Sequence, residues 1–225
     1  MTDTLKNDRL KNDGLKNDTP KEDVRSDGPF DESEAVFEGI NRVDLGGLLI
    51  AVPPGVEIQV QADQASGRIT VLTLKDGNSG MQIHPYAARK SGGMWDEVRT
   101  TIIKSINEAG GLVEEVPGPW GIELNAQIQA QGESPGLQPA RFVGIDGPRW
   151  FLRAVFLGQG ARDQAAAKRL TDCLRSAVVV RGDSAMAPGA PIVLTLPKQV
   201  EKSAEVSDRE VPNPFERGPE ITETR

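Results

Sequence analysis

The part of the chain that follows its polar N-terminal segment carries the hydrophobic pattern of four successive β-strands. Residues 42–55 form a mostly apolar run that ends in two prolines and a glycine, which predicts a buried strand followed by a turn. Residues 56–61 alternate apolar and polar side chains, as a strand with one exposed face does. Apolar runs at 68–74 and 80–88 follow after short turns, and Pro85 in the second run favours a sheet edge or a strand end. Together the four runs predict an antiparallel meander.

The hydrophobic period changes to that of a helix at two places. In residues 93–109 apolar side chains recur every three or four positions, and Gly110 and Gly111 are typical of a helix C-terminus. Residues 162–177 show the same spacing. We therefore predict two amphipathic helices, each with one apolar face.

Further strands are predicted between the two helices. Residues 112–116 and 121–131 flank a turn rich in proline and glycine. Residues 140–158 contain Asp146-Gly147 between two strong β runs, and this dipeptide is typical of a two-residue hairpin turn. We therefore predict that residues 140–158 form a hairpin.

The order of these elements predicts the α+β class. After the second helix, residues 178–180 fit a last helical turn or a short strand, and residues 192–196 fit a final short strand. Strands in hairpins with segregated helices favour an antiparallel sheet with the two helices packed on one face. The pattern leaves open whether the strands form one sheet or two.

Both ends of the chain are predicted to be disordered. Residues 1–34 repeat Leu-Lys-Asn-Asp every five positions, a spacing that matches neither a helix nor a strand. Residues 198–225 are similarly polar and contain three prolines. We therefore predict a single domain at residues 35–197 between two disordered tails. The alternative for either tail is a docking peptide, and Phe215 is the only aromatic residue of the C-terminal one.

The charge of the chain lies mostly in these tails. The net charge is −7 in 225 residues, and residues 1–34 hold ten acidic and six basic side chains while residues 198–225 hold seven and five. The remaining domain is nearly neutral and has no basic stripe, which makes nucleic acid an improbable partner. The sequence also has no apolar run long enough to span a bilayer, no secretory signal and a single cysteine, so we predict a soluble cytoplasmic protein without a membrane partner.

Few side chains support catalytic or metal chemistry. His84 is the only histidine and Cys173 the only cysteine, which excludes metal sites built from several His and Cys ligands. Neither a glycine-rich phosphate loop nor a Gly-x-Ser-x-Gly elbow occurs. We therefore predict no catalytic residue, no metal and no cofactor, with Cys173 in the core and His84 at a strand end.

The predicted hairpin at 140–158 sorts its side chains onto two faces. With Asp146-Gly147 as the turn, Val143 lies opposite Trp150, and one face is mainly apolar. Arginine combined with aromatic residues is typical of binding surfaces, and that combination marks the other face. Its side chains are those of Phe142, Arg149, Phe151, Arg153 and Val155.

Each of these candidates has a structural alternative. Arg149 and Arg153 could instead lie along the sheet and cover it, or pair with Glu114 or Glu123. Trp120, in a turn with two prolines and two glycines, is either an exposed contact or a plug for the end of the core. The pattern alone does not choose between these placements.

Three stretches resemble a known family. They are "DLGGLLIAVPPG" (Asp44 to Gly55), "GPWGIELNA" (Gly118 to Ala126) and "GIDGPRWFLRAVFLG" (Gly144 to Gly158). Together they are similar to an uncharacterised family of actinobacterial cytoplasmic proteins that share a domain of unknown function, so the resemblance implies no activity. The order of the elements is also similar to the α/β sandwich of the photosystem accessory PsbP and Ran-binding Mog1 families, and such a likeness implies an architecture only.

Two functions fit the sequence. The first is a non-enzymatic binding or adaptor domain that contacts a protein partner through the Arg/aromatic face, and the absence of a catalytic constellation favours it. The second is an enzyme or a binder of a small anionic ligand held by Arg149 and Arg153, with Glu123 or His84 as proton carrier. The candidate binding residues are Arg149, Phe151, Arg153, Phe142 and Trp120.

Overall fold

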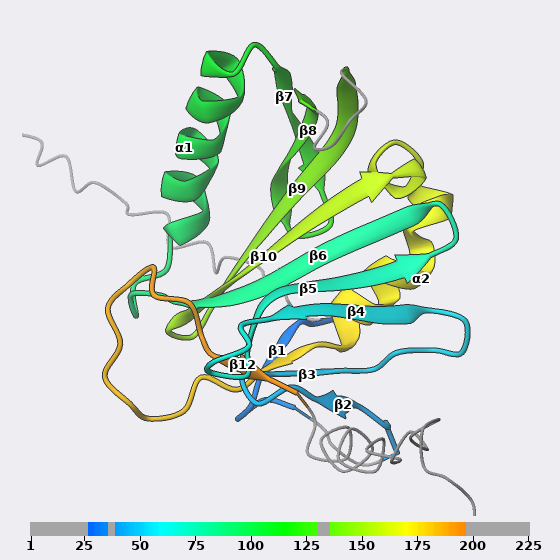
Figure 1. Ribbon diagram of the computed structural model, residues 1–225. Coiled ribbons are helices and arrows are strands. Elements are labelled where there is room, and N and C mark those ends of the chain that lie inside the picture. The colour runs from blue at the N-terminus through cyan, green and yellow to red at the C-terminus, as the bar shows by residue number, and fades with distance from the viewer. Residues whose placement is uncertain (1–26, 36–38, 130–135, 197–225) are drawn as a thin grey trace, which may run out of the picture.

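A computed structural model describes residues 27–35, 39–129 and 136–196, and these form two β-sheets and two α-helices (Figure 1). The larger sheet has the strand order β12-β5-β6-β10-β9-β8-β7, and β4 also pairs with β5. Its strands are β4 (Glu57–Ala62), β5 (Arg68–Asp76), β6 (Ser79–Ala87), β7 (Leu112–Gly118), β8 (Gly121–Gln129), β9 (Leu137–Gly147), β10 (Trp150–Gly158) and β12 (Leu194–Thr195). Its pairings are antiparallel, as the meander pattern predicts.

The smaller sheet joins segments from the two ends of the described chain. Its strand order is β1-β11-β3-β2, built from β1 (Phe30–Asp31), β2 (Val43–Asp44), β3 (Leu48–Ile50) and β11 (Val178–Val179). The strands β1 and β11 are parallel and place Phe30 beside Val178. The sequence left the number of sheets open, and the structure has two.

The position of β1 differs from the prediction that residues 1–34 are a tail. Gly28 and Pro29 are buried, and the Gly28 carbonyl accepts a hydrogen bond of 2.7 Å from the Trp120 indole nitrogen. The segment is polar in sequence and still part of the fold, because it is held by backbone groups and by Asp31, which accepts a hydrogen bond from the Trp150 indole. Residues 1–26 and 197–225, where disorder is predicted, lie outside the described residues, and so do the last two residues of the strand predicted at 121–131.

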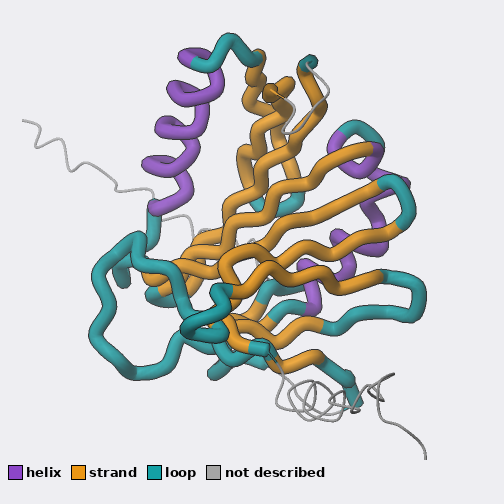
Figure 2. The backbone as a smooth tube through the Cα atoms, in the orientation of Figure 1, coloured by secondary structure: helices purple, strands orange, loops and turns teal. Residues whose placement is uncertain are grey.

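The two helices follow the predicted bounds closely. They are α1 (Met94–Glu108) and α2 (Gln164–Ser176), and a short 3₁₀ turn, η1 (Gln159–Ala161), precedes α2. Asp163 caps α2 by accepting a hydrogen bond from the Ala165 backbone N–H at 2.8 Å. The secondary structure of the described chain is thus α+β, as predicted (Figure 2). Neither helix is long and apolar enough to cross a membrane.

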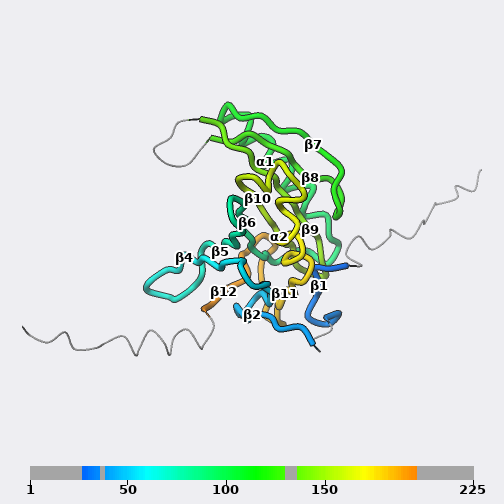
Figure 3. Tube along the Cα trace, turned by 90° about the vertical axis from the view of Figure 1, so that its right-hand side faces the viewer, coloured from blue at the N-terminus to red at the C-terminus, as the bar shows by residue number. Residues whose placement is uncertain are grey.

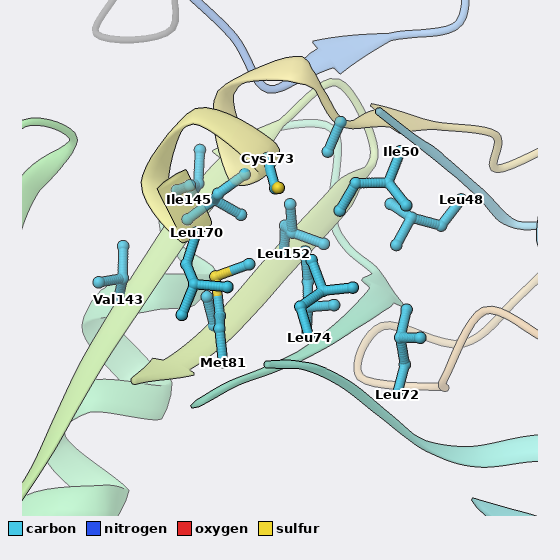
Figure 4. Close-up of a cluster of buried hydrophobic side chains, with 14 of the residues drawn as sticks. Leu48, Ile50, Leu72, Leu74, Met81, Val143, Ile145, Leu152, Leu170 and Cys173 are labelled. Atoms are coloured by element: carbon cyan, nitrogen blue, oxygen red, sulfur yellow. The ribbon is translucent and has the colours of Figure 1, made fainter. Parts of the chain in front are cut away.

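The helices lie on opposite faces of the larger sheet, which corrects the expectation that they share one face (Figures 1 and 3). Helix α2 packs with the smaller sheet against Leu152, Ala154 and Phe156 of β10, and these side chains are fully buried. Figure 4 shows Leu170 and Cys173 of α2 beside strand side chains in this main core. We call this side the α2 face. The sequence shows one apolar stripe on each helix and does not show which side of the sheet each stripe covers.

Helix α1 covers part of the other side, which we call the α1 face. Trp95 of α1 packs on Phe151 of β10, with the two rings stacked at 6.1 Å between centroids. Gly144 of β9 makes this approach possible, because a Cβ atom there would lie 2.2 Å from the Trp95 ring. The Asp146 carboxylate accepts hydrogen bonds from the Met94 and Trp95 backbone N–H groups and thereby caps the start of α1.

The hairpin of β9 and β10 turns two residues later than predicted. Gly147, not Val143, lies opposite Trp150, so the turn residues are Pro148 and Arg149. Pro148 fixes the first corner, and Arg149 takes a left-handed conformation at φ 61°. A shift of two residues in a period of two leaves every side chain on its predicted face, so the division of β10 into two faces is confirmed although the register is wrong.

Candidate functional site

The larger sheet forks on the α1 face. Strands β5 and β6 pair from Asp76 opposite Ser79 as far as Leu72 opposite Ile83, and then separate. The segment Gly189–Thr195, which we call the crossing segment, fills the gap. Its backbone bonds to β6 through Ala87 and Pro85, and its last two residues, as β12, pair with β5. Pro85 has no backbone N–H to offer a neighbouring strand, and the pairing with β5 ends at Ile83, two residues before it.

A groove of about 470 Å³ lies at this fork. Its floor is the α1 face of β5, β6 and β10, and the crossing segment forms one wall. Most of the lining surface is apolar, and none of the described residues that line it is acidic. The residues that line it are 68–72, 82–84, Tyr86, Arg153, Val155 and 191–193.

Three polar or aromatic side chains meet in the groove. His84 lies directly opposite Arg153 in the pairing of β6 with β10. The Arg153 guanidinium carbon is 5.3 Å from the centre of the Tyr86 ring, and the His84 ring centre is 5.0 Å from the same ring. Tyr86 also contacts the cluster beneath α1, so it separates the groove from that cluster. Strand pairing therefore holds a cation, an imidazole and a phenol side by side.

The electrostatics of His84 favour its neutral form. Burial lowers the pKa of the imidazole, and the positive charge of Arg153 lowers this pKa further. The Nε2 atom is buried and has no hydrogen-bond partner among the described residues. His84 as a whole is half-buried and lines the groove, so a ligand there would contact the exposed part of the imidazole ring and not Nε2.

The arrangement suits an anion that carries an apolar group. Five arginines of the described chain form ion pairs with carboxylates, namely Arg89, Arg99, Arg141, Arg169 and Arg175. Arg153 and Arg68 form no ion pair within the described ranges, and both line the groove. No group of three potential metal ligands occurs in the part of the chain that the structure describes. The groove therefore offers positive charge, the exposed part of one imidazole ring and apolar surface.

Three of the candidate residues are core side chains. Phe151 is 1% exposed and lies beneath α1, and Phe142 packs against the same cluster. Trp120 is 6% exposed and belongs to the main core, with its indole N–H bound to the Gly28 carbonyl. Their surfaces are used within the fold, and the placement of Trp120 corresponds to the core plug expected as the alternative to an exposed contact. Arg153 alone of the five candidates lines the groove.

Arg149 and Arg153 are not brought together. Arg149 is exposed in the hairpin turn, four residues from Arg153, and an extended chain of that length spans about 13 Å. The Arg149 carbonyl accepts hydrogen bonds from Ala88 and Arg181, which fixes the turn in place. Arg153 lines the groove and Arg149 does not.

Glu123, the other candidate proton carrier, lies on the α2 face. Its carboxylate pairs with the Arg141 guanidinium at 3.0 Å, and both side chains are less than a tenth exposed. The Arg141 guanidinium lies 4.0 Å from the centre of the Phe156 ring. Burial raises the pKa of Glu123, and Arg141 opposes that rise. The sheet therefore separates Glu123 from His84, so they do not share a site.

The sequence analysis missed two parts of the groove. Tyr86 follows His84 by two positions in a strand, so the period of two already places both on one face. The crossing segment is more than a hundred residues away in sequence, and no local pattern shows where it lies. Cys173, expected in the core, is 1% exposed, and burial raises its pKa to about 11, which keeps the thiol protonated.

Two solved structures show how far the fold compares with known ones. A protein from Bacteroides thetaiotaomicron aligns with a TM-score of 0.36 at 12% identity, over 62% of this chain and 47% of its own length, so this chain spans about half of that protein. The solution structure of cyanobacterial PsbP from Synechocystis aligns with a TM-score of 0.37 at 11% identity, over 65% of this chain and 98% of its own. No functionally curated protein matches the sequence.

The family resemblance of the sequence is confirmed in a specific form. A family model described as a protein of unknown function, DUF3710, matches residues 28–203. This range includes β1 and the three stretches on which the resemblance was based, and it covers more than half of the chain. The chain therefore belongs to the DUF3710 family of proteins of unknown function.

Proposed function

We propose that this protein is a binding domain whose groove holds a carboxylate that is attached to an apolar group. The observation that carries the proposal is the lining of the groove: Arg153 and Arg68 lie on a mostly apolar surface, and no acidic side chain is among the described lining residues. A hydrogen bond between charged groups contributes about 1.5–3 kcal/mol, and apolar contact adds to it. The groove volume is within the range that holds a small ligand or one or two side chains of a peptide.

The carboxylate can come from two sources. A free organic acid would place its carboxylate at Arg153 and its apolar part on Val71, Val155 and the crossing segment. An acidic peptide of a partner protein would present the same groups from neighbouring side chains, which is the adaptor role expected from the sequence. Neither source needs the buried Phe151 and Trp120 or the half-buried Phe142 to be accessible.

The test uses two residues that occur once in the chain. His84 is the only histidine and Tyr86 the only tyrosine, so their NMR signals report on the groove without ambiguity. Full-length protein labelled at these residues is titrated with phenylacetate, with phenylacetamide as the uncharged match, and with the acetylated, amidated dipeptide Phe-Glu. Phenylacetate is expected to shift both signals and to raise the pKa of His84, because it neutralises Arg153. Preference for phenylacetate or for the dipeptide identifies the source.

Two arginine variants make the test specific. Arg153→Gln is expected to weaken phenylacetate binding at least 10-fold, as the loss of a charged hydrogen bond predicts. Arg149→Gln is the matched control and is expected to leave the affinity within about twofold. Equal binding of the acid and the amide, or an equal loss in the two variants, would show that the groove is not an anion site centred on Arg153.

A reaction on an anionic substrate is the second candidate function. The observation that favours it is the lowered pKa of His84, since a neutral imidazole beside a bound anion could accept a proton. Turnover that His84→Gln abolishes, while phenylacetate still binds, would support an enzyme. Unchanged turnover in that variant would remove His84 from any catalytic role.

A further inference from the structure

The C-terminal segment, residues 198–225, pairs apolar with acidic residues throughout. Each of its five larger apolar residues stands directly next to a glutamate, in the pairs Val200-Glu201, Glu205-Val206, Glu210-Val211, Phe215-Glu216 and Glu220-Ile221. A carboxylate beside an apolar side chain is the chemistry that the groove fits. The chain therefore contains several copies of the ligand that its own groove would select.

The repeat of the N-terminal segment has the opposite pattern. The three leucines of its repeat, Leu5, Leu10 and Leu15, are each followed by a lysine and have no acidic neighbour. A cation next to the apolar side chain would be repelled by Arg153 and Arg68. Charge complementarity therefore distinguishes the two ends of the chain, although both are acidic as a whole.

The C-terminal segment also starts beside the groove. The described chain ends at Leu196, directly after β12, whose Thr195 pairs with Arg68 at the rim. Phe215 lies 19 residues beyond Leu196, which allows a reach of up to about 60 Å. Because the segment is joined to β12 in the same chain, its effective concentration at the groove is on the order of a millimolar, so that even a weak contact is populated.

We propose that residues 198–225 bind in the groove of their own domain, with Phe215 on its apolar surface and Glu216 at Arg153. This inference rests on the proposed function of the groove. Phe215-Glu216 is the best of the five pairs because phenylalanine buries the largest apolar area. An external ligand must displace the segment. The apparent affinity of the groove for that ligand is therefore its intrinsic affinity multiplied by the fraction of time for which the groove is free.

The experiment measures contact between the segment and the groove in the full-length chain. A nitroxide label is attached at Gly218→Cys, and the His84 and Tyr86 signals are recorded. Cys173 is 1% exposed and is not expected to react, which is checked by treating the unsubstituted chain with the same reagent. The label is expected to broaden both signals, and Phe215→Ala or Arg153→Gln is expected to restore them. The same label at Gly14→Cys, in the N-terminal segment, is the matched control and is expected to have no effect.

A second measurement separates this inference from the proposed function. The double substitution Phe215→Ala/Glu216→Gln is expected to raise the phenylacetate affinity of the full chain at least threefold, because the competitor is weakened. If the label leaves both signals sharp and the affinity does not change, the segment is not the occupant, although phenylacetate binding still supports the groove. If phenylacetate fails to shift His84 even in the double variant, the proposed function itself is wrong.

A mixing experiment tests whether the contact is within one chain. Isotope-labelled chains without nitroxide are combined with spin-labelled chains that carry no isotope. Sharp signals in the mixture support binding within the chain. Broadening that is as strong in the mixture as in the doubly labelled chain would overturn it in favour of exchange between two copies.

Discussion

The two faces of the larger sheet are built from alternate residues of the same strands, yet they are covered to different extents. On the α2 face, helix α2 and the smaller sheet bury Leu152, Ala154 and Phe156 completely. On the α1 face, α1 covers Phe151 but leaves Arg153 and Tyr86 at an open groove. The position of one helix relative to one strand thus separates a structural surface from a candidate binding surface.

Charged groups also differ between the two faces. On the α2 face, Glu123 and Arg141 are buried and paired with each other through Glu123 Oε2, while Glu123 Oε1 has no hydrogen-bond partner among the described residues. On the α1 face, His84 Nε2 has no partner within the described residues, and Arg153 has no ion pair there. Buried ion pairs commonly serve the fold, whereas unpaired groups at a concave surface favour binding. The substitutions below test this division.

The largest effect is expected at the buried ion pair. Glu123→Ala leaves Arg141 buried without its carboxylate and is expected to lower the free energy of unfolding by about 3–5 kcal/mol. Glu115→Ala is the matched control, because Glu115 is half exposed where it pairs with Arg99 of α1 at the rim of the α1 face, and pairs open to solvent contribute about 0–1 kcal/mol. Urea denaturation of both variants gives the comparison. Equal losses would show that the α2 face is no better sealed than the rim of the α1 face.

A smaller loss is expected where α1 packs on the sheet. Gly144→Ala puts a Cβ atom into the Trp95 ring and is expected to cost about 1–3 kcal/mol, with a change in tryptophan fluorescence as α1 shifts. Gly80→Ala on β6 is the control, since the nearest atom to its Cβ would lie 4.0 Å away. A Gly144→Ala variant as stable as Gly80→Ala would mean that α1 does not pack closely on β9.

Periodicity predicted the elements because their signals are local. The bounds of α1 and α2 follow from apolar spacing, and the two faces of β10 follow from alternation even though the hairpin register was wrong. The turn was misassigned because Asp146-Gly147 matches a hairpin dipeptide, whereas Asp146 caps α1 and Pro148-Arg149 makes the turn. That choice depends on a helix fifty residues earlier, which a local pattern does not contain.

The candidate site was predicted only in part, for the same reason. Arg153 was identified from its neighbours in the hairpin. Its position opposite His84 was not predicted, because it depends on the register of β6 against β10, which the local sequence pattern does not contain. The crossing segment enters the groove through backbone hydrogen bonds, which leave no signature in side-chain pattern. Phe142 and Phe151 were predicted to be binding residues because an aromatic residue in a strand gives the same sequence signal whether its side chain packs under a helix or contacts a partner.

Arg153→Gln is expected to change stability little while it removes the groove's central charge. Arg153 has no ion pair in the described chain, and its contact with the Tyr86 ring is worth about 0.5–1 kcal/mol at an exposed site. The free energy of unfolding from urea denaturation should therefore fall by no more than that amount, although phenylacetate binding is weakened at least 10-fold. A loss above about 2 kcal/mol would show that Arg153 is a structural residue and would weaken the contrast between the two faces.

The smallest effect is the pH dependence that His84 contributes. Its pKa is lowered in the folded protein, first by burial and then by Arg153, so between the two pKa values the unfolded chain binds more protons at this site than the folded one. The stability from neutral His84 is therefore fully present above the unfolded pKa of about 6.5 and is lost as the pH falls through the folded pKa. Urea midpoints of the parent chain and of His84→Gln, measured from about pH 8 to about pH 5, should diverge with the parent losing more. The carboxylates are the same in the two chains, so their titrations cancel in the difference between the midpoints, and because the chain has one histidine this difference reports on His84 alone. A difference between the midpoints that does not change with pH would mean that the groove leaves His84 fully solvated.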